Sequence, residues 1–405
     1  MKPKTVADPV GEFYTNHPYP PPLENLDRVR DMWQDENVHR AEYHLLWPHK
    51  EYRAEINVLI AGCGTWQAAK FALTHPAARV VAIDISRTSL DHTEALKQKY
   101  DVANLETRQL PIENAADLDQ RFDYIISTGV LHHLADPDAG VRALGSVLAD
   151  DGVMYLMLYA PYGRTGVKMI QDYCRRLGVG TTEQEINDLT EVLRHLSQYH
   201  PLVLMMQGTR DGLDANALVD AVLNPRDRTY SVPELFEFVE RNGLKFERWY
   251  WQAPYLPHCG AISETPHASR LAALPERDQF TQMELWRGLM NNHDFVVRKG
   301  DVESEVSFDD EQYLRYVPIR RPWTMCVQDA LPEGAAGMLL NRTHLFNDLF
   351  FSIGEEEKQM YDAIDGRRDV SEIIETVKGA SPLARDFFQK LWRYDQVVFD
   401  TSRAQ

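Results

Sequence analysis

The most constraining feature of the sequence is a turn of small residues between an apolar segment and a helical one. The segment Val58-Leu-Ile-Ala-Gly-Cys-Gly-Thr-Trp66 contains this turn, and Asp84 stands 20 residues after Gly64, at the end of the next apolar run. Small residues let a ligand approach the backbone, and the free N–H groups of the turn and helix start face that ligand. An acidic residue at the tip of the next strand can hydrogen-bond both hydroxyls of a ribose. The pattern therefore predicts a nucleotide-type cofactor at one edge of a sheet.

Apolar runs of strand length alternate with helical segments around this turn. Strands are expected at 56–61, 79–84, 105–109, 122–127, 152–159, 245–251 and 293–299, and helices at 67–74, 89–100, 139–148 and 231–243. Short strands and helices in this alternation imply right-handed βαβ crossovers. The predicted fold class is α/β, a doubly wound, mostly parallel Rossmann-like sheet over residues 51–300.

Three further segments interrupt or flank this pattern. Residues 161–228 break the alternation and are expected to form a helical insertion that caps the substrate. Residues 1–50 form an N-terminal arm or lid, in which consecutive prolines should keep 13–22 out of regular helix. Residues 301–405 are expected to form a separate small α+β domain, with helices at 355–364, 371–377 and 383–394 and a strand at 397–400.

The residues after Gly64 decide between two kinds of cofactor. A dinucleotide site requires a third glycine, as GxGxxG, to admit a pyrophosphate at the helix N-terminus. The sequence has Thr65, Trp66 and Gln67 instead. The bulky Trp66 argues against a pyrophosphate and is compatible with a cofactor that has no phosphates. A glycine turn in an arbitrary α/β protein is the other alternative, and the strand context with Asp84 argues against it.

Residues 56–160 resemble the class I S-adenosylmethionine-dependent methyltransferase family. The glycine-rich first motif, the acidic second motif and the fourth-strand motif occur in order at 58–65, 82–86 and 122–134. The turn at 148–155 departs from the usual Leu-x-Pro-Gly-Gly, because Asp150 and Asp151 replace the Pro and the first Gly. The resemblance implies S-adenosyl-L-methionine as the cofactor and methyl transfer as the activity.

The same resemblance assigns cofactor contacts to residues at the strand ends. It places a glycine-rich group against the methionine portion, an acid at the ribose, and apolar residues at the adenine. The expected cofactor-binding residues are Gly62, Cys63, Gly64, Asp84, Ile85, Leu110, Pro111, Thr128 and Gly129.

Candidate catalytic residues lie at the carboxyl edge of the predicted sheet and in the arm. His132 and His133 follow the fourth strand, and either could orient the acceptor or take its proton. Tyr159 follows the fifth strand, and Tyr14 could close the site and exclude water. Structural hydrogen bonding is the alternative for the histidines, and pinning of an extended arm is the alternative for Tyr14.

Candidate substrate contacts come from two loops. Tyr162 and Arg164 open the insertion, where Arg164 could clamp an anionic group through bidentate hydrogen bonds. His17 and Tyr19 stand in the arm, upstream of the sheet. An ion pair between Arg164 and an acidic neighbour is the alternative for that residue.

The C-terminal segment resembles a small winged-helix-like module at residues 355–400. Residues 301–405 hold 12 Lys and Arg against 20 Asp and Glu, which argues against DNA binding. A structural or self-association role is expected instead, including a homodimer formed through this domain.

Composition limits the partners of the whole chain. The net charge is −18, which disfavours nucleic acids and anionic membranes as partners. The four cysteines form no CxxC pair, so no metal site is expected, and a reduced, cytoplasmic compartment fits best. The preferred acceptor is the S, O or N atom of a small molecule, with a small thiol among the candidates. A protein or peptide methyltransferase and a non-catalytic cofactor-binding scaffold are the alternatives.

Overall fold

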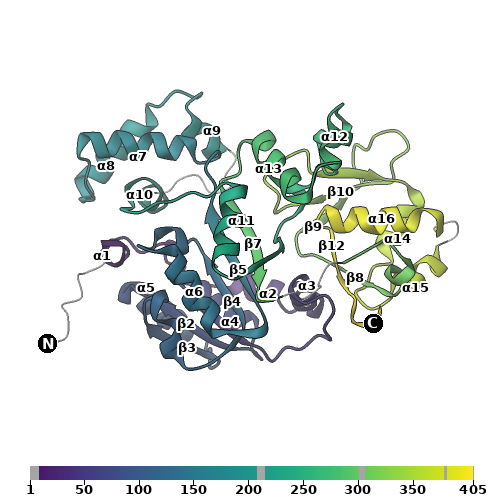
Figure 1. Ribbon diagram of the computed structural model, residues 1–405, viewed down its shortest axis with the longest axis horizontal. Coiled ribbons are helices and arrows are strands. Elements are labelled where there is room, and N and C mark those ends of the chain that lie inside the picture. Colours follow the sequence, from purple (N-terminus) through teal and green to yellow (C-terminus); the bar gives the residue numbers. More distant parts are fainter. Residues whose placement is uncertain (1–8, 208–214, 301–305, 378–380, 405) are drawn as a thin grey trace. The chain divides into compact units, whose positions relative to one another are not determined.

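The computed structural model describes residues 9–207, 215–300, 306–377 and 381–404 (Figure 1). Its contacts divide the chain into two compact units. The first spans residues 1–30, 55–246 and 288–300, and the second spans residues 31–54, 247–287 and 301–405. The chain therefore passes from one unit to the other several times.

A seven-stranded sheet forms the centre of the first unit. The strand order is β3-β2-β1-β4-β5-β7-β6, in which β1 to β5 run parallel and β7 runs antiparallel to β5. The bounds are β1 Asn57–Ala61, β2 Arg79–Asp84, β3 Leu105–Gln109, β4 Phe122–Thr128, β5 Leu148–Tyr159, β6 Lys245–Trp249 and β7 Asn292–Arg298. The predicted fold class, a mostly parallel Rossmann-like sheet, is confirmed.

Helices cover the faces of this sheet, which explains why its central strands are apolar along their whole length. Val58, Leu59 and Ile60 of β1 are fully buried, as expected for a strand covered on both sides. The covering helices are α4 Gln67–Thr74, α5 Arg87–Lys99, α6 Pro137–Val147 and α11 Val232–Arg241. Helix α5 begins two residues before the predicted start, because the cap is Ser86, whose Oγ accepts a hydrogen bond from Ser89 N at 3.2 Å.

The predicted helical insertion is formed by four helices between β5 and α11. They are α7 Thr165–Leu177, α8 Glu183–Arg194, α9 Pro201–Gln207 and α10 Ala215–Leu223. Their apolar faces share a small core that includes Val167, Leu189 and Leu202. Helices α7 and α9 approach closely at Gly166, where an added Cβ would lie 2.0 Å from Leu202 N. A glycine is therefore required at that crossing.

The N-terminal arm contains a short helix, α1 Pro9–Asn16, which buries Val10 and Phe13. The prediction that 13–22 contains no regular helix is wrong for its first four residues. The first proline of this segment is Pro18 and the consecutive ones are Pro20 to Pro22, so helix is excluded only after α1.

The second unit is an α+β assembly with two small antiparallel sheets. Strands β9 Thr324–Val327, β10 Gly337–Asn341 and β11 Phe350–Ile353 form one sheet, and β8 Val317–Arg320 pairs with β12 Val397–Asp400 in the other. Strands β8 to β11 were not predicted. Its helices are α3 Glu36–Leu46, α12 Ala268–Ala272, α13 Glu276–Arg287, α14 Glu355–Asp362, α15 Val370–Thr376 and α16 Ser381–Arg393, and α2 Asp27–Met32 precedes them.

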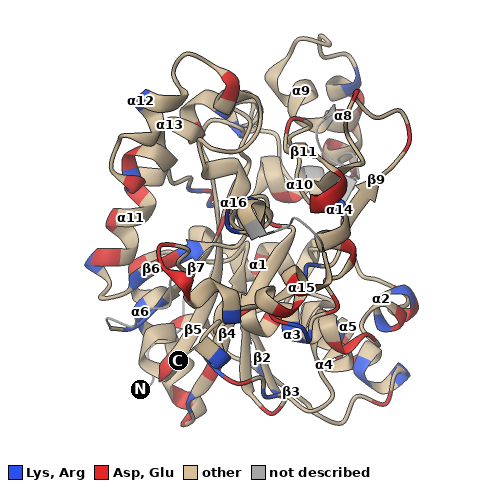
Figure 2. Cartoon of the chain, turned by 90° about the vertical axis from the view of Figure 1, so that its right-hand side faces the viewer, with Lys and Arg blue, Asp and Glu red and all other residues tan. Residues whose placement is uncertain are grey.

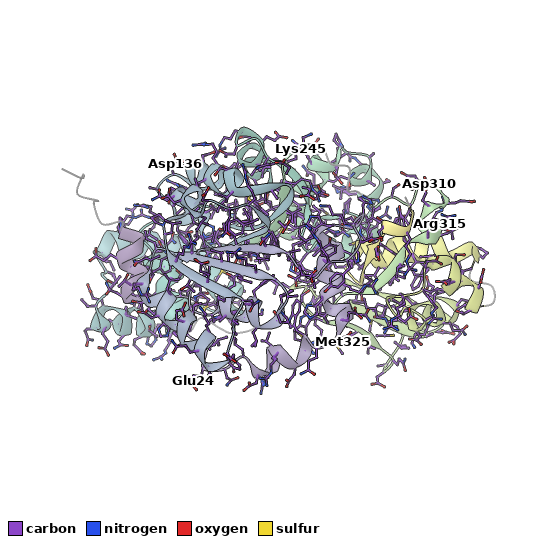
Figure 3. All side chains as sticks on the ribbon, turned by 90° about the horizontal axis from the view of Figure 1, so that it is seen from below. Glu24, Asp136, Lys245, Asp310, Arg315 and Met325 are labelled. Atoms are coloured by element: carbon purple, nitrogen blue, oxygen red, sulfur yellow. The ribbon has the colours of Figure 1, made fainter. Side chains whose placement is uncertain are left out.

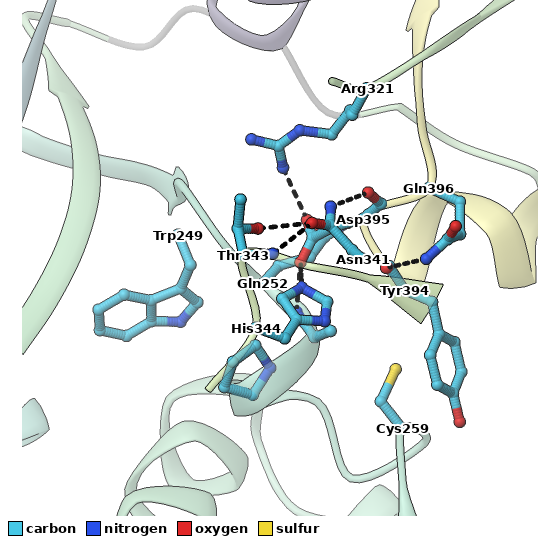
Figure 4. A network of polar contacts seen from close by, with 12 residues as sticks. Trp249, Gln252, Cys259, Arg321, Asn341, Thr343, His344, Tyr394, Asp395 and Gln396 are labelled. Carbon is cyan, nitrogen blue, oxygen red and sulfur yellow. Dashed lines mark hydrogen bonds and ion pairs between the residues drawn. The ribbon is translucent and has the colours of Figure 1, made fainter. Parts of the chain in front are cut away.

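A buried polar network ties the second unit together around Asp395, which is 1% exposed (Figure 4). Its carboxylate accepts hydrogen bonds from Arg321 Nη1 and His344 Nε2, both at 3.0 Å, and from Ala253 N at 3.0 Å. Asn341 Nδ2 donates to the Asp395 backbone carbonyl at 2.8 Å. Burial alone would raise the pKa of Asp395, but His344 and Arg321 hold it below its ordinary value. The four partners come from three segments, at 253, 321 and 341–344, so the network fixes the packing of this unit.

Charged residues lie mainly at the surfaces of the units. Glu24, Asp136 and Lys245 are exposed in the first unit, and Asp310 and Arg315 in the second (Figure 3). Acidic residues also occupy the first turn of α14 at 355–357 (Figure 2). Their negative charges interact favourably with the positive end of the helix dipole.

Several expectations about the outer parts stay predictions. They are the winged-helix identity, the domain boundaries 1–50, 51–300 and 301–405, and the homodimer. None of the helices in the described ranges combines the length and apolar character that a membrane crossing requires.

Candidate functional site

A cavity of about 1060 Å³ opens at the carboxyl ends of β1, β2, β4 and β5, within the first unit. Its walls come from the glycine turn after β1, the N-terminal arm, the ends of β2 and β4, and the helical insertion. This is the edge at which α/β proteins bind ligands. The cavity therefore brings together segments that span more than 280 residues of sequence, from Val10 to Asn292.

The glycine turn forms the floor of one end. Gly62 and Gly64 have φ of 75° and 57°, in the left-handed region that favours glycine. An added Cβ at Gly62 would lie 2.4 Å from Val130 Cγ2, and one at Gly64 would lie 2.9 Å from Pro20 Cδ. Glycines are therefore needed both for the backbone conformation and for the space, and the turn exposes a cradle of main-chain atoms to the cavity.

Asp84 closes this end from the tip of β2. Its Oδ2 accepts a hydrogen bond from Gly64 N at 2.9 Å, and its Oδ1 accepts one from Ser86 N at 2.8 Å. Burial raises the pKa of Asp84, although the backbone N–H groups of Ser86, Gly64 and Ile85 oppose that shift. An ionised carboxylate can accept about four hydrogen bonds, so acceptor capacity is left for a ligand.

The predicted adenine and methionine contacts also line the cavity. Ile85, Leu110 and Pro111 lie along one wall, and Thr128 and Gly129 follow β4. Gln67 Nε2 of α4 donates to Thr128 Oγ1 at 3.0 Å, which holds the Thr128 side chain in place.

The arm is fastened over the glycine turn by hydrogen bonds to its backbone. Thr65 Oγ1 donates to Pro20 O at 2.7 Å, and Ser86 Oγ donates to Tyr14 O at 3.2 Å. Gly11 of α1 packs on Ile85, where an added Cβ would lie 3.2 Å from Cδ1. These contacts bring Tyr14 and Tyr19 to the cavity, and the role of the arm as a lid stays a prediction.

The other end of the cavity contains a buried carboxylate that the sequence did not indicate. Asp220 of α10 is 4% exposed, and its Oδ1 accepts a hydrogen bond from Tyr14 OH at 2.7 Å. Asn224 Nδ2 donates to Tyr14 OH at 3.0 Å. Burial raises the pKa of Asp220, and burial together with the Asp220 charge raises the pKa of Tyr14. Tyr14 is therefore a protonated donor at neutral pH.

The two histidines have different surroundings. His133 lines the cavity, with Nδ1 in contact with Arg226 O and Nε2 without a hydrogen-bond partner among the described residues. His132 does not line the cavity, and its ring centroid lies 3.9 Å from that of Tyr159. Burial lowers the pKa of both rings, most strongly for His132, so both are neutral at pH 7. Only His133 presents itself to a ligand.

Arg164 forms part of the wall but is already paired. Its Nη2 lies 3.1 Å from Asp227 Oδ2, and its guanidinium carbon lies 3.5 Å from the centroid of the Tyr159 ring. Burial alone would raise the pKa of Asp227, but the charges of Arg164 and Lys168 hold it below its ordinary value. The ion pair thus fixes the Tyr159 ring at the cavity wall.

Most of the predicted site residues are brought together, and three are not. His132, His17 and Tyr162 do not line the cavity, and Tyr162 is 42% exposed. The sequence reasoning missed Asp220, Met157, Asn291 and Asn292, which do line it. Asn291 directly precedes β7 and Asn292 is its first residue, so their position depends on the antiparallel return of that strand beside β5.

The family match lies within the first unit. Residues 59–154, from β1 to β5, match the model of a family described as "Methyltransferase domain". This part of the chain is a class I S-adenosylmethionine-dependent methyltransferase domain. The predicted enzyme class and cofactor are confirmed.

Relatives of the methyltransferase domain differ in how much of the chain they match. A protein of Synechococcus sp. without an assigned function is 26% identical over 337 residues, which are 78% of each chain. The ubiquinone biosynthesis O-methyltransferase of Neisseria meningitidis serogroup C is 26% identical over 142 residues, 33% of this chain and 59% of that protein.

One solved structure resembles the chain beyond the methyltransferase domain. PKMT2 from Rickettsia typhi, a protein lysine methyltransferase, has a TM-score of 0.62 at 14% identity, over 91% of this chain and 75% of that one. A second structure of PKMT2, in complex with AdoHcy, has a TM-score of 0.56. At this identity the likeness shows the fold.

The cradle in the methyltransferase domain fits S-adenosylmethionine. Gly62, Cys63 and Gly64 line the cavity with main-chain atoms, and Asp84 beside them retains acceptor capacity. Among the described residues, no group of three or more His, Cys, Asp or Glu side chains is placed to hold a metal ion.

Proposed function

We propose that the protein transfers a methyl group to a nucleophilic S, O or N atom of a small molecule that enters the Asp220 end of the cavity. The observation that carries this proposal is the cavity itself. The glycine turn, Asp84, Tyr14, His133 and Asp220 all line it, together with residues of the arm and of the insertion. A cavity lined in this way suits a small molecule.

The cofactor residues would act by position. Gly62 and Gly64 would hold the methionine portion against the backbone, Asp84 would accept the ribose hydroxyls, and Thr128 and Gly129 would lie beneath the sulfonium. When bound, S-adenosylmethionine supplies an electrophilic methyl group, and the reaction then depends mainly on alignment and exclusion of water.

The acceptor end would supply orientation and, where needed, a proton acceptor. Nε2 of His133 is the buried ring nitrogen that a ligand in the cavity could reach, and a neutral imidazole can accept a proton there. Tyr14 would close the cavity from the arm and orient Asp220 through its hydroxyl. Tyr159, held under Arg164, would form an aromatic wall.

A second candidate function is methylation of a lysine side chain of a protein. Its support is the fold likeness to PKMT2, which extends over 91% of this chain and therefore includes much of the second unit. In that case the lysine side chain would enter the cavity of the first unit.

Labelled S-adenosylmethionine separates these functions. The purified protein would be incubated with the label and with thiols, phenols, amines and a cell extract. Label in a low-mass fraction supports the small-molecule function, and label in protein supports the second candidate. Absence of any transfer across the panel would contradict both and favour a non-catalytic cofactor-binding scaffold.

A further inference from the structure

The part of the cavity beside α10 contains a buried carboxylate, that of Asp220, without an ion-pair partner among the described residues. Among the described residues, no Lys, Arg or His lies within ion-pair distance of Asp220, and its polar contacts are the hydroxyl of Tyr14 and the amide of Asn224. Both of these are neutral groups. A buried carboxylate without a cation is costly, because desolvation is not offset by an opposite charge.

The cations nearby are engaged elsewhere. Arg164 and Lys168 both pair with Asp227, at 3.1 and 3.5 Å. His133 lies beside Asp220, but burial holds the pKa of its ring below the ordinary value, and the ring is neutral at pH 7. Among the described residues, the carboxylate of Asp220 is therefore left without an ion-pair partner of its own.

The carboxylate is also held in one position. Tyr14 OH donates to Oδ1, and Asn224 fixes Tyr14 OH in turn. Because Tyr14 belongs to the arm, the carboxylate is oriented only when the arm is in place over the cavity. A group oriented in this way, and spared from pairing with the protein, is suited to pair with a ligand.

We propose that the methyl acceptor is an amine, which binds as an ammonium ion paired with the carboxylate of Asp220. This inference rests on the proposed function and narrows its acceptor from S, O or N to N. Before transfer, one proton passes from the ammonium to an oxygen of Asp220. The freed nitrogen lone pair then forms the new N–C bond as the S–CH3 bond breaks, and the bonding electrons stay on sulfur. The products are a methylammonium and S-adenosylhomocysteine, and the Asp220 proton returns to solvent.

Asp220 could instead pair with the positive sulfur of the cofactor. The two alternatives differ in a measurable way, because S-adenosylhomocysteine is uncharged at sulfur. Pairing with the cofactor predicts that Asp220→Asn weakens S-adenosylmethionine much more than S-adenosylhomocysteine. Pairing with an amine predicts similar small changes for both.

The test is calorimetry on the full chain saturated with S-adenosylhomocysteine at pH 7.5. The probes are n-hexylamine, which is an ammonium ion at this pH, and the neutral 1-hexanol and 1-hexanethiol. Wild-type protein should bind hexylammonium at least tenfold tighter than either neutral probe. Asp220→Asn should abolish this preference, and Asp220→Glu should retain part of it. Asp172→Asn removes an exposed carboxylate from α7 of the same insertion and should leave the preference intact.

The outcomes distinguish a failure of the proposed function from a failure of the amine inference. Failure of wild type to bind S-adenosylhomocysteine would contradict the proposed function itself. Binding of S-adenosylhomocysteine with no preference for hexylammonium in wild type would overturn the amine inference alone. If Asp220→Asn lost affinity for S-adenosylmethionine alone, that result would also overturn the amine inference.

The amine could belong to a small molecule or to a lysine side chain. A transfer assay with labelled cofactor distinguishes these sources by comparing n-hexylamine with the peptide acetyl-Gly-Lys-Gly-amide. Transfer to hexylamine alone identifies a small amine, and a clear preference for the peptide identifies a lysine side chain. Transfer to hexanethiol but to neither amine would overturn the inference.

Discussion

Asp84 and Asp220 both line one cavity and are held there by different kinds of donor. Asp84 accepts hydrogen bonds from main-chain N–H groups, among them those of Gly64 and Ser86. Asp220 is held by the side-chain hydroxyl of Tyr14, which Asn224 orients. Burial raises the pKa of both carboxyl groups. The position of a carboxylate held by main-chain donors is set by the backbone of the sheet. A carboxylate held by side chains can be replaced or moved by substitutions that suit a different methyl acceptor.

This difference predicts that the two ends can be disabled separately. The largest effect is expected from Asp227→Asn, because this change removes the charge partner of the buried Arg164 guanidinium. Breaking a buried ion pair from one side costs about 3 kcal/mol or more. Thermal unfolding should show a midpoint several degrees below wild type, while affinity for S-adenosylhomocysteine per folded molecule stays within about threefold. An unchanged midpoint would mean that this pair does not stabilise the acceptor end.

The next effect in size is expected at the cofactor end. Asp84→Ala removes the carboxylate expected to accept the ribose hydroxyls, and hydrogen bonds to a charged group contribute about 1.5–3 kcal/mol. Calorimetry should show S-adenosylhomocysteine affinity lowered by about 10- to 100-fold. Asp91→Asn, an exposed carboxylate on α5 paired with Arg87, serves as the matched control and should bind as wild type does.

A smaller effect is expected from Tyr14→Phe at the acceptor end. The change keeps the ring and removes the hydroxyl that donates to Asp220 Oδ1. Loss of one such hydrogen bond should weaken hexylammonium binding about three- to tenfold, with little change for S-adenosylhomocysteine. Equal weakening of both ligands would indicate that Tyr14 acts by holding the whole arm closed.

The pH dependence should be the mildest effect. Protonation of Asp220 removes its charge, so hexylammonium affinity should fall as the pH is lowered through the pKa of Asp220, which burial places above its ordinary value. The groups that face Asp220 are Tyr14, Asn224, His133 and Arg164. In calorimetry from pH 5 to 8, wild type should lose affinity toward the acidic end, and Asp220→Asn should bind weakly and evenly throughout. A flat profile for wild type would contradict a role for this carboxylate.

The same contrast explains which features were predictable from sequence. The glycine turn, Asp84 and the strands around them follow from local rules, because a left-handed backbone requires glycine and buried parallel strands require apolar runs. Asp220 lies on a helix of the insertion and reaches the cavity only through the packing of α10. No local pattern marks such a residue. Strands β8 to β11 were missed for a related reason, since they are four or five residues long and pair across the second unit.

The helix α1 in the arm was not predictable from composition. The density of prolines and aromatics between 13 and 22 suggested an extended segment. Phe13 nevertheless lies in α1, because its burial stabilises the helix. The helix ends before the first proline of the segment, Pro18.

The most direct measurement of the central claim is paired calorimetry on wild type, Asp84→Ala and Asp220→Asn. S-adenosylhomocysteine is titrated first, and n-hexylammonium is then titrated into the complex. Asp84→Ala should lose most of its affinity for S-adenosylhomocysteine, whereas Asp220→Asn should keep it and lose the preference for hexylammonium. A cavity whose two ends did not act separately would give both variants the same losses, and that result would contradict the account.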